Sequence, residues 1–310
     1  MHFRSLFPIL LPLLVFQAAC DFEDAFSDSQ RHREDFQYSY ALKPGGTLTL
    51  ENFNGAVEIL SWEKDEVRIT GTKYARFEGD LRELKIETTA SPEAVRIRTV
   101  RPERRNRGMG AKYMLRVPRQ VELERIVTSN GSIRVEDIRG LSRLESSNGS
   151  ITLRRMRGRL DAKTSNASIS GDDLESEAVL RTSNGSIRID QMSGTLEATT
   201  SNAGIHVRVS KPVPRQALKL DTSNGSIELT MDSFEENEVR ARTSNSSITV
   251  RLPPEVRARV RASTSNASIH SDFDALTRGI RKNFLEGEIG SGGPLIQLTS
   301  SNGSIRVLRL

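Results

Sequence analysis

Four histidines are the first residues in this 310-residue chain that could support acid–base or metal chemistry: His2, His32, His206 and His270. His206 and His270 each follow the isoleucine of a repeated motif, where other copies carry arginine, as at Arg188. That position points outward from the predicted strand. The two histidines lie three repeats apart, about 14 Å at a stacking step of about 4.8 Å, which is too far for one metal ion. We expect no metal site and no cofactor.

Carboxylates and serines could also support catalysis, as in the carbohydrate-cleaving β-helices. Asp172 and Asp173 form the only adjacent pair of aspartates, and they fall at a predicted corner. Because neighbouring side chains diverge, such a pair rarely converges on one substrate atom, whereas a glycosidase needs two carboxylates about 5 to 9 Å apart in a cleft. The serines recur in every repeat, while a nucleophile is singular and paired with a base. The sequence predicts no enzyme, with a carbohydrate-active β-helix enzyme as the alternative.

The strongest feature is an internal repeat, in which Thr/Ser-Ser-Asn is followed by a small residue, Ser or Gly, and Ile. Successive copies are 18, 18, 18, 18, 22, 21, 21 and 36 residues apart. The last spacing is twice 18, so we expect a degraded copy at Glu286 to Ile289, and Asn54 begins an earlier motif of similar shape. The asparagines of the nine full copies are Asn130, Asn148, Asn166, Asn184, Asn202, Asn224, Asn245, Asn266 and Asn302.

Between the motifs, apolar residues alternate with polar ones, as at Leu196, Ala198 and Thr200, which indicates a short strand on each side of the asparagine. A second corner often carries glycine, as at Gly158 and Gly194. Two strands and two corners make one coil, so the predicted fold class is an all-β β-solenoid with coils of about 18–22 residues. Stacked corner asparagines are expected to form a structural ladder of side-chain amides.

A meander of hairpins is the rival fold, because Asn-Gly is also a strong signal for a two-residue hairpin turn. However, alanine or serine follows the asparagine in several copies, at Ala167, Ser246 and Ala267. A type I′ turn tolerates those residues poorly at its second position, whereas a solenoid corner has no such requirement. The pattern therefore favours the solenoid.

Four segments follow from these patterns. Residues 1–19 read as a signal peptide, residues 20–36 as a modified cysteine with a polar tether, residues 37–125 as an N-terminal β region or cap, and residues 126–310 as the β-solenoid. Residues 6–16 are an apolar run that is too short to span a bilayer. Cys20 is the only cysteine, which rules out a disulfide within one chain.

Cys20 has small residues before it, Ala18 and Ala19, and resembles the lipidated cysteine of bacterial lipoproteins. Gln17 departs from that pattern, in which an aliphatic residue is usual. The resemblance implies lipidation at Cys20 and an anchor in a membrane of the cell envelope, facing either the periplasm or the outside. Several acyl chains, at about 0.8 kcal/mol per buried CH₂, would make that anchor permanent.

Composition limits the remaining possibilities. Aromatic residues are only 5% of the chain, so a core must be built from Ile, Val, Leu and Ala. The net charge is +5, from 45 basic and 40 acidic residues. This small excess on a heavily charged surface, with no aromatic interleaving, gives no indication of nucleic-acid binding.

A further set of motifs accompanies the repeats: Pro44-Gly45-Gly46, Asn52-Phe53-Asn54-Gly55, Ser61-Trp62-Glu63 and Gly290-Ser291-Gly292-Gly293-Pro294 before Ser301-Asn302-Gly303-Ser304-Ile305. Together they resemble, over residues 37–310, a bacterial family of domains of unknown function that carries an unproven adhesin label. The resemblance implies a β-solenoid in the cell envelope and supplies no catalytic residues.

The expected function is therefore that of a non-enzymatic, adhesin-like envelope lipoprotein that presents a rigid, repetitive β surface. Its expected partners are the membrane, through the N-terminal lipid, and a polysaccharide, peptidoglycan or another envelope protein. A periplasmic structural or stress-related protein is a further alternative.

Overall fold

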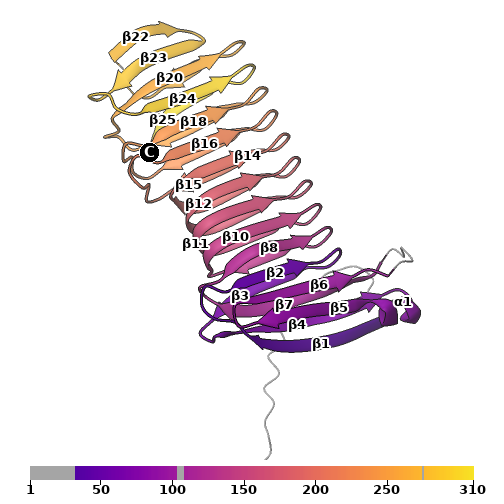
Figure 1. Cartoon of the computed structure of the whole chain (residues 1–310). Helices are drawn as coiled ribbons and strands as arrows, with labels where there is room; N and C mark the ends of the chain where they lie inside the picture. Colours follow the sequence, from indigo (N-terminus) through magenta and orange to yellow (C-terminus); the bar gives the residue numbers. More distant parts are fainter. Residues whose placement is uncertain (1–31, 103–107, 274–275) are drawn as a thin grey trace, which may run out of the picture. The chain divides into compact units, whose positions relative to one another are not determined.

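The computed structural model describes residues 32–102, 108–273 and 276–310, so Cys20 and the expected signal peptide lie outside the described residues. The described residues belong to one compact unit, Arg31–Leu310. They form 25 strands that are hydrogen-bonded into one continuous sheet, together with one short helix, α1 (Glu78–Glu83). The fold is therefore the all-β solenoid that the repeat predicts (Figure 1).

Each coil contributes one strand before the asparagine corner and one after it. The strands before the corner form the pre-corner face, in the spatial order β6 (Ala94–Val100), β2 (Thr47–Glu51), β8 (Glu122–Thr128), β10 (Arg139–Ser146), β11 (Ile151–Lys163), β12 (Ile169–Arg181), β14 (Leu196–Thr199), β16 (Ala217–Asp221), β18 (Glu238–Arg242), β24 (Leu295–Ser300) and β20 (Ala258–Thr264). All these neighbours are parallel.

The strands after the corner form the post-corner face, which is also parallel. Strands β11 and β12 run through the second corner and belong to both faces. The spatial order of the post-corner face is β7 (Gly110–Pro118), β3 (Val57–Trp62), β9 (Ile133–Glu136), β11, β12, β13 (Ile187–Ser193), β15 (Ile205–Val209), β17 (Ile227–Met231), β19 (Ile248–Leu252), β25 (Ile305–Arg309) and β21 (Ile269–Ser271).

The core lies between the two faces and is built from identical residues stacked in register. The isoleucine of each motif pairs with the isoleucine of the next coil, in the order Ile133, Ile151, Ile169, Ile187, Ile205, Ile227, Ile248, Ile305 and Ile269. All but Ile269 are completely buried. Burial of such a side chain contributes about 1.5–3 kcal/mol, but only when another coil covers it, so the stack stabilises itself coil by coil.

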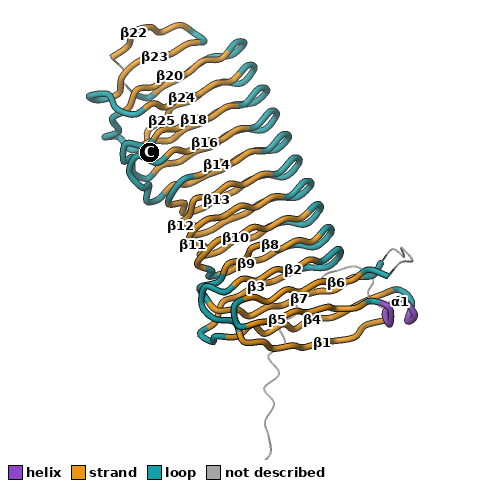
Figure 2. Tube along the Cα trace, in the orientation of Figure 1, coloured by secondary structure: helices purple, strands orange, loops and turns teal. Residues whose placement is uncertain are grey.

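The second corner has a conformational feature that the glycine pattern does not reveal. Four non-glycine residues, 18 positions apart, adopt left-handed backbone with φ between 50° and 59°: Asp137, Arg155, Asp173 and Gln191. Three residues later comes glycine in three of the four coils, as at Gly158 with φ of 110°. Those three coils therefore have two residues with positive φ at the second corner. The asparagine corners form the row of short turns seen in Figure 2.

At both ends of the stack, the spatial order of the coils departs from the chain order. Strands β2 and β3 lie between β6/β7 and β8/β9, and the last strands of the chain, β24 and β25, lie between β18/β19 and β20/β21 (Figure 1). The motif at Asn302 is thus inserted between the motifs at Asn245 and Asn266.

The expectation of a degraded copy of the motif at Glu286 to Ile289 is wrong. Those residues belong to β23 (Phe284–Ile289), which runs antiparallel to β20 and to β22 (Leu276–Arg281). The spacing of 36 residues arises because a hairpin extends the end of the pre-corner face before the chain returns. On the post-corner face the last strand is β21, with only three residues, which leaves little edge open for pairing.

Antiparallel strands also cover the N-terminal end of the stack. Strand β1 (His32–Ala41) pairs with β4 (Glu66–Ala75), which pairs with β7, and β5 (Lys85–Ser91) pairs with β6. Strand β1 begins at His32, so the last five residues of the expected 20–36 tether are strand. Of the expected 37–125 region, β2 and β3 stack directly on β8 and β9 within the solenoid.

Candidate binding surfaces

The asparagine corner carries a continuous series of side-chain hydrogen bonds. Each Nδ2 donates to the Oδ1 of the preceding coil, as from Asn148 to Asn130 at 2.6 Å and from Asn202 to Asn184 at 2.6 Å. The complete spatial order is Asn54, Asn130, Asn148, Asn166, Asn184, Asn202, Asn224, Asn245, Asn302 and Asn266. At the N-terminal end, Nδ2 of Asn54 donates to the Met109 carbonyl at 2.9 Å. Because every amide points the same way, each has a second N–H left for solvent or a ligand.

A second, buried ladder runs beside the first and was missed by the sequence analysis. The residue two positions before each asparagine of the nine full motif copies is Thr or Ser, and its hydroxyl donates to the corner carbonyl of the preceding coil, as from Thr200 to Gly185 at 2.9 Å. The members, all buried, are Thr128, Ser146, Thr164, Thr182, Thr200, Thr222, Thr243, Ser300 and Thr264. Its signal in the sequence was the invariable hydroxyl at that position of the motif.

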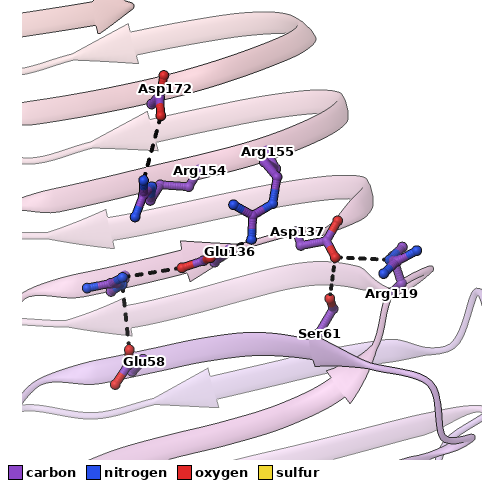
Figure 3. Close-up of polar contacts among 9 residues, drawn as sticks. Glu58, Ser61, Arg119, Glu136, Asp137, Arg154, Arg155 and Asp172 are labelled. Atoms are coloured by element: carbon purple, nitrogen blue, oxygen red, sulfur yellow. Dashed lines mark hydrogen bonds and ion pairs between the residues drawn. The ribbon is translucent and has the colours of Figure 1, made fainter. Parts of the chain in front are cut away.

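Ion pairs connect neighbouring coils on the post-corner face (Figure 3). Glu136 lies between two arginines, with Arg134 Nη2 at 3.3 Å and Arg155 Nη2 at 2.5 Å, and Arg134 Nε is 3.6 Å from Glu58. Partial burial alone would raise the pKa of Glu136, but the hydrogen bonds and charges of Arg155 and Arg134 outweigh it and hold that pKa below its usual range.

The aspartates of the predicted corner are held apart by different partners. Asp172 lies 3.8 Å from Arg154 on the post-corner face (Figure 3), whereas Asp173 accepts hydrogen bonds at 3.0 and 3.1 Å from Arg157 Nη2. The two carboxylates therefore pair with different arginines, Arg154 and Arg157. Asp137, at the equivalent corner, accepts from Ser61 at 2.9 Å and from Arg119 at 3.0 Å.

The three described histidines lie on different strands, β1, β15 and β21. His206 lies 3.5 Å from Glu228, and His270 lies 3.0 Å from Asp272. Between His206 and His270, the register partners on successive strands are Glu228, Thr249 and Arg306. The two histidines are therefore four strand steps apart, about 19 Å. The expected separation of three repeats was wrong because β25 is inserted between β19 and β21. His32 begins β1, while His2 lies outside the described residues. Across residues 32–102, 108–273 and 276–310, no group of three His, Cys, Asp or Glu side chains could hold a metal ion.

The pre-corner face has a groove of about 560 Å³ near its N-terminal end, where five adjacent strands, β6, β2, β8, β10 and β11, meet. Glu51 bridges two cations of this groove, at 3.3 Å from Arg125 and 4.0 Å from Arg98. Two further arginines of the lining, Arg96 and Arg143, have no carboxylate of the described residues within ion-pair distance. The charged lining consists of Glu51, Arg96, Arg98, Glu124, Arg125, Arg143, Glu145, Asp161 and Lys163.

None of the helical residues that the structure describes forms a segment with the length and apolar character needed to cross a bilayer.

Fold and surfaces together define a β-solenoid with two charged faces that meet at a polar asparagine corner. The chain belongs to the Toastrack family of domains of unknown function, DUF4097, whose model matches residues 46–308. This match confirms the family resemblance that the repeats predict.

Three solved bacterial structures are similar over 89% of this chain. A candidate cell adhesion protein from Clostridium sporogenes is 10% identical, is covered over 100% of its length and has a TM-score of 0.25. A candidate adhesin from Parabacteroides distasonis is 10% identical, with 97% covered and a TM-score of 0.38. A candidate adhesin from Bacteroides fragilis is 11% identical, with 97% covered and a TM-score of 0.25. No curated protein sequence matches this chain.

Proposed function

We propose that this protein is a non-enzymatic, adhesin-like lipoprotein of the bacterial cell envelope, which presents a rigid, repetitive surface to a polymeric partner. The observation that supports this role is the unbroken register of the corner asparagines, from Asn54 to Asn266, with an exposed charged face on either side. The register fixes side chains at one-strand intervals of about 4.8 Å. A periodic surface of this kind suits a ligand that is itself a repeating chain, because many weak contacts add up along it.

Lipidation at Cys20 would hold the solenoid at a membrane. Its support is the sequence alone, in which an apolar run and two alanines precede the cysteine. Eleven residues separate Cys20 from His32, the first residue of β1. An extended segment of that length spans at most about 40 Å, so the solenoid would stay close to the membrane that anchors it.

Fractionation and protease shaving of cells that carry the full chain or its Cys20→Ala variant test the anchoring. We expect the wild type in the membrane fraction, the variant in the soluble fraction, and cleavage of the wild type by protease added to intact cells. Soluble wild type would contradict the anchor. Cleavage only after the outer membrane is opened would contradict adhesion and leave a periplasmic structural role.

Incubation of the purified Cys20→Ala chain with isolated peptidoglycan and envelope polysaccharide tests the non-enzymatic role. We expect the protein to sediment with one of these polymers, while chain length and reducing ends stay constant over hours. Shortened chains would instead support the carbohydrate-active enzyme, and the absence of binding to every envelope fraction would contradict the adhesin-like role.

A further inference from the structure

Strand β24 separates two strands that carry exposed arginines. On the pre-corner face, Gln297 pairs in register with Arg240 of β18 on one side and with Arg261 of β20 on the other. Two residues further along β24, Thr299 pairs with Arg242. The insertion of β24 thus places an uncharged strand between two basic ones, an arrangement that exists only because the end of the chain returns into the stack.

These residues form a groove, here named the β24 groove. The arginines are exposed and long, whereas the glutamine and threonine are shorter and half-buried, so the former make walls and the latter a floor. Opposing walls are two strands apart, about 9.6 Å, and side chains on one wall repeat about every 6.6 Å. The walls are Arg240 and Arg242 on β18 and Arg259 and Arg261 on β20, and the floor is Gln297 and Thr299.

Two hollows in the surface support this shape. One, of about 160 Å³, is lined by Glu238, Arg240 and Gln297 among others. The other, of about 270 Å³, is lined by Arg259 and Arg261 together with Glu286 and Glu288. Leu295 of β24 contributes to both, so they adjoin along this strand.

The four arginines keep charge available for a ligand. Glu288 and Glu286 of β23 stand opposite Arg259 and Arg261 in register, yet no carboxylate of the described residues lies within ion-pair distance of any wall arginine. Arg259 donates from Nε to the Gly293 carbonyl at 3.1 Å, which is a neutral acceptor. Guanidinium groups left without carboxylates bind carboxylate or sulfate groups in a bidentate manner.

We propose that the β24 groove binds an extended acidic polysaccharide. Acidic groups of the polymer pair with Arg240 and Arg261, while the amide of Gln297 and the hydroxyl of Thr299 exchange hydrogen bonds with sugar hydroxyls. A single-stranded nucleic acid would need aromatic side chains on which its bases stack, and neither walls nor floor supply one. This inference rests on the proposed function and names the site and ligand class through which the surface would act.

Titration of the purified Cys20→Ala chain with polygalacturonate, an extended polycarboxylate, tests the site. We expect binding that the double variant Arg240→Ser/Arg261→Ser weakens by about tenfold or more, since the variant removes two guanidinium groups that can form charge-assisted hydrogen bonds with the polymer. Gln297→Glu, which places a carboxylate on the floor without removing an arginine, should weaken binding as well. Unchanged circular dichroism and denaturation midpoints verify that the variants are folded.

The matched control is Arg188→Ser/Arg306→Ser, which removes the same charge from exposed positions of the post-corner face. It should bind like the parent chain. The proposal is overturned if the groove variants bind polygalacturonate normally, if Arg96→Ser/Arg143→Ser in the N-terminal groove removes binding instead, or if the parent chain does not bind. In each case the shaving and sedimentation experiments still decide the proposed function, because they use intact cells and the envelope polymers instead of polygalacturonate.

Discussion

At the scale of single residues, the hydroxyl of Thr200 shows how a buried polar group specifies the corner. Its side chain is buried beside Leu196 and Ala198, yet its Oγ1 donates to the Gly185 carbonyl of the preceding coil. A buried carbonyl without a donor costs about 1–3 kcal/mol, so the hydroxyl ladder penalises any shift of one coil against the next. The amide ladder connects the same neighbouring coils, but it is exposed to water, and its hydrogen bonds all run in one direction.

We predict that Thr200→Val lowers the unfolding free energy by about 1–3 kcal/mol, because valine keeps the shape of threonine and leaves the Gly185 carbonyl unpaired. Thr200→Ser should be less destabilising, since Ser146 and Ser300 already make this bond in other coils. Chemical denaturation of the two variants and the parent measures the difference. A valine variant as stable as the serine variant would show that the hydroxyl contributes nothing.

Glu136 makes a residue-scale prediction about pH. Its pKa is lowered in the folded protein by Arg155 and Arg134, which outweigh partial burial. A carboxyl with a depressed folded pKa contributes stability that is present above its unfolded pKa and is lost as the pH falls through the folded value. The stability difference between the parent and Glu136→Gln should therefore be largest at neutral pH and shrink below the ordinary glutamate range. Denaturation at several pH values measures it, with Glu124→Gln, an exposed glutamate outside these ion pairs, as control; parallel curves would contradict the prediction.

At the scale of elements, the sequence predicts which residues form coils but not the order in which all coils stack. Strands and asparagine corners could be located because the motif repeats at a fixed spacing and apolar residues alternate. The position of the inserted coil could not be predicted, because the motif at Asn302 has the same pairing surfaces as the others. Parallel pairing does not determine which coils become its neighbours. The left-handed residues of the second corner were missed because Asp137 and Arg155 are not glycines.

One signal of the insertion was present in the residue after each asparagine. The first three of these residues in spatial order, Gly55, Gly131 and Gly149, are all glycine. From Gly149 on, glycine alternates with a larger residue: Gly149, Ala167, Gly185, Ala203, Gly225, Ser246, Gly303 and Ala267. In chain order the alternation fails, because Ala267 follows Ser246. Glycine is required at Gly303 for a steric reason, since a Cβ there would lie 1.7 Å from the Ser246 carbonyl oxygen.

A disulfide test distinguishes the two orders. Thr249 and Arg306 are register partners on β19 and β25, whereas Thr249 and His270 are two strands apart. In the Cys20→Ala background, we expect Thr249→Cys/Arg306→Cys to form a disulfide on oxidation, because parallel neighbours fall within the Cα separation of 4.4–6.8 Å that a disulfide needs. Thr249→Cys/His270→Cys, at about 9.6 Å, should stay reduced. Peptide mass mapping under non-reducing conditions identifies the bond, and a disulfide in the second variant alone would place the coils in chain order.

At the scale of the whole molecule, the interactions that maintain the fold and those available to a ligand are physically separate. One apolar cluster runs through the stack, and backbone ladders join every coil to the next. The charges lie outside this core, and many of their ion pairs are exposed, as between Lys43 and Glu93 and between Arg159 and Glu177. Exposed pairs contribute little to stability because water and salt screen them, so the surface can change its charge with little effect on the coils beneath.

Salt should therefore separate binding from folding. Raising NaCl from about 0.1 M to about 1 M shortens the Debye length from about 10 Å to about 3 Å, which screens exposed arginines from a polyanion. Apolar burial and buried hydrogen bonds are not screened in this way. We expect the affinity for polygalacturonate to fall by at least tenfold, as estimated for the loss of about 1.4 kcal/mol of charge interaction, while the thermal midpoint of the same chain shifts by a few degrees at most. Calorimetric titrations and melting curves at matched salt concentrations measure both. If the midpoint fell together with the affinity, the surface charges would be part of what holds the coils together, and a ligand that neutralised them would also change the stability of the solenoid.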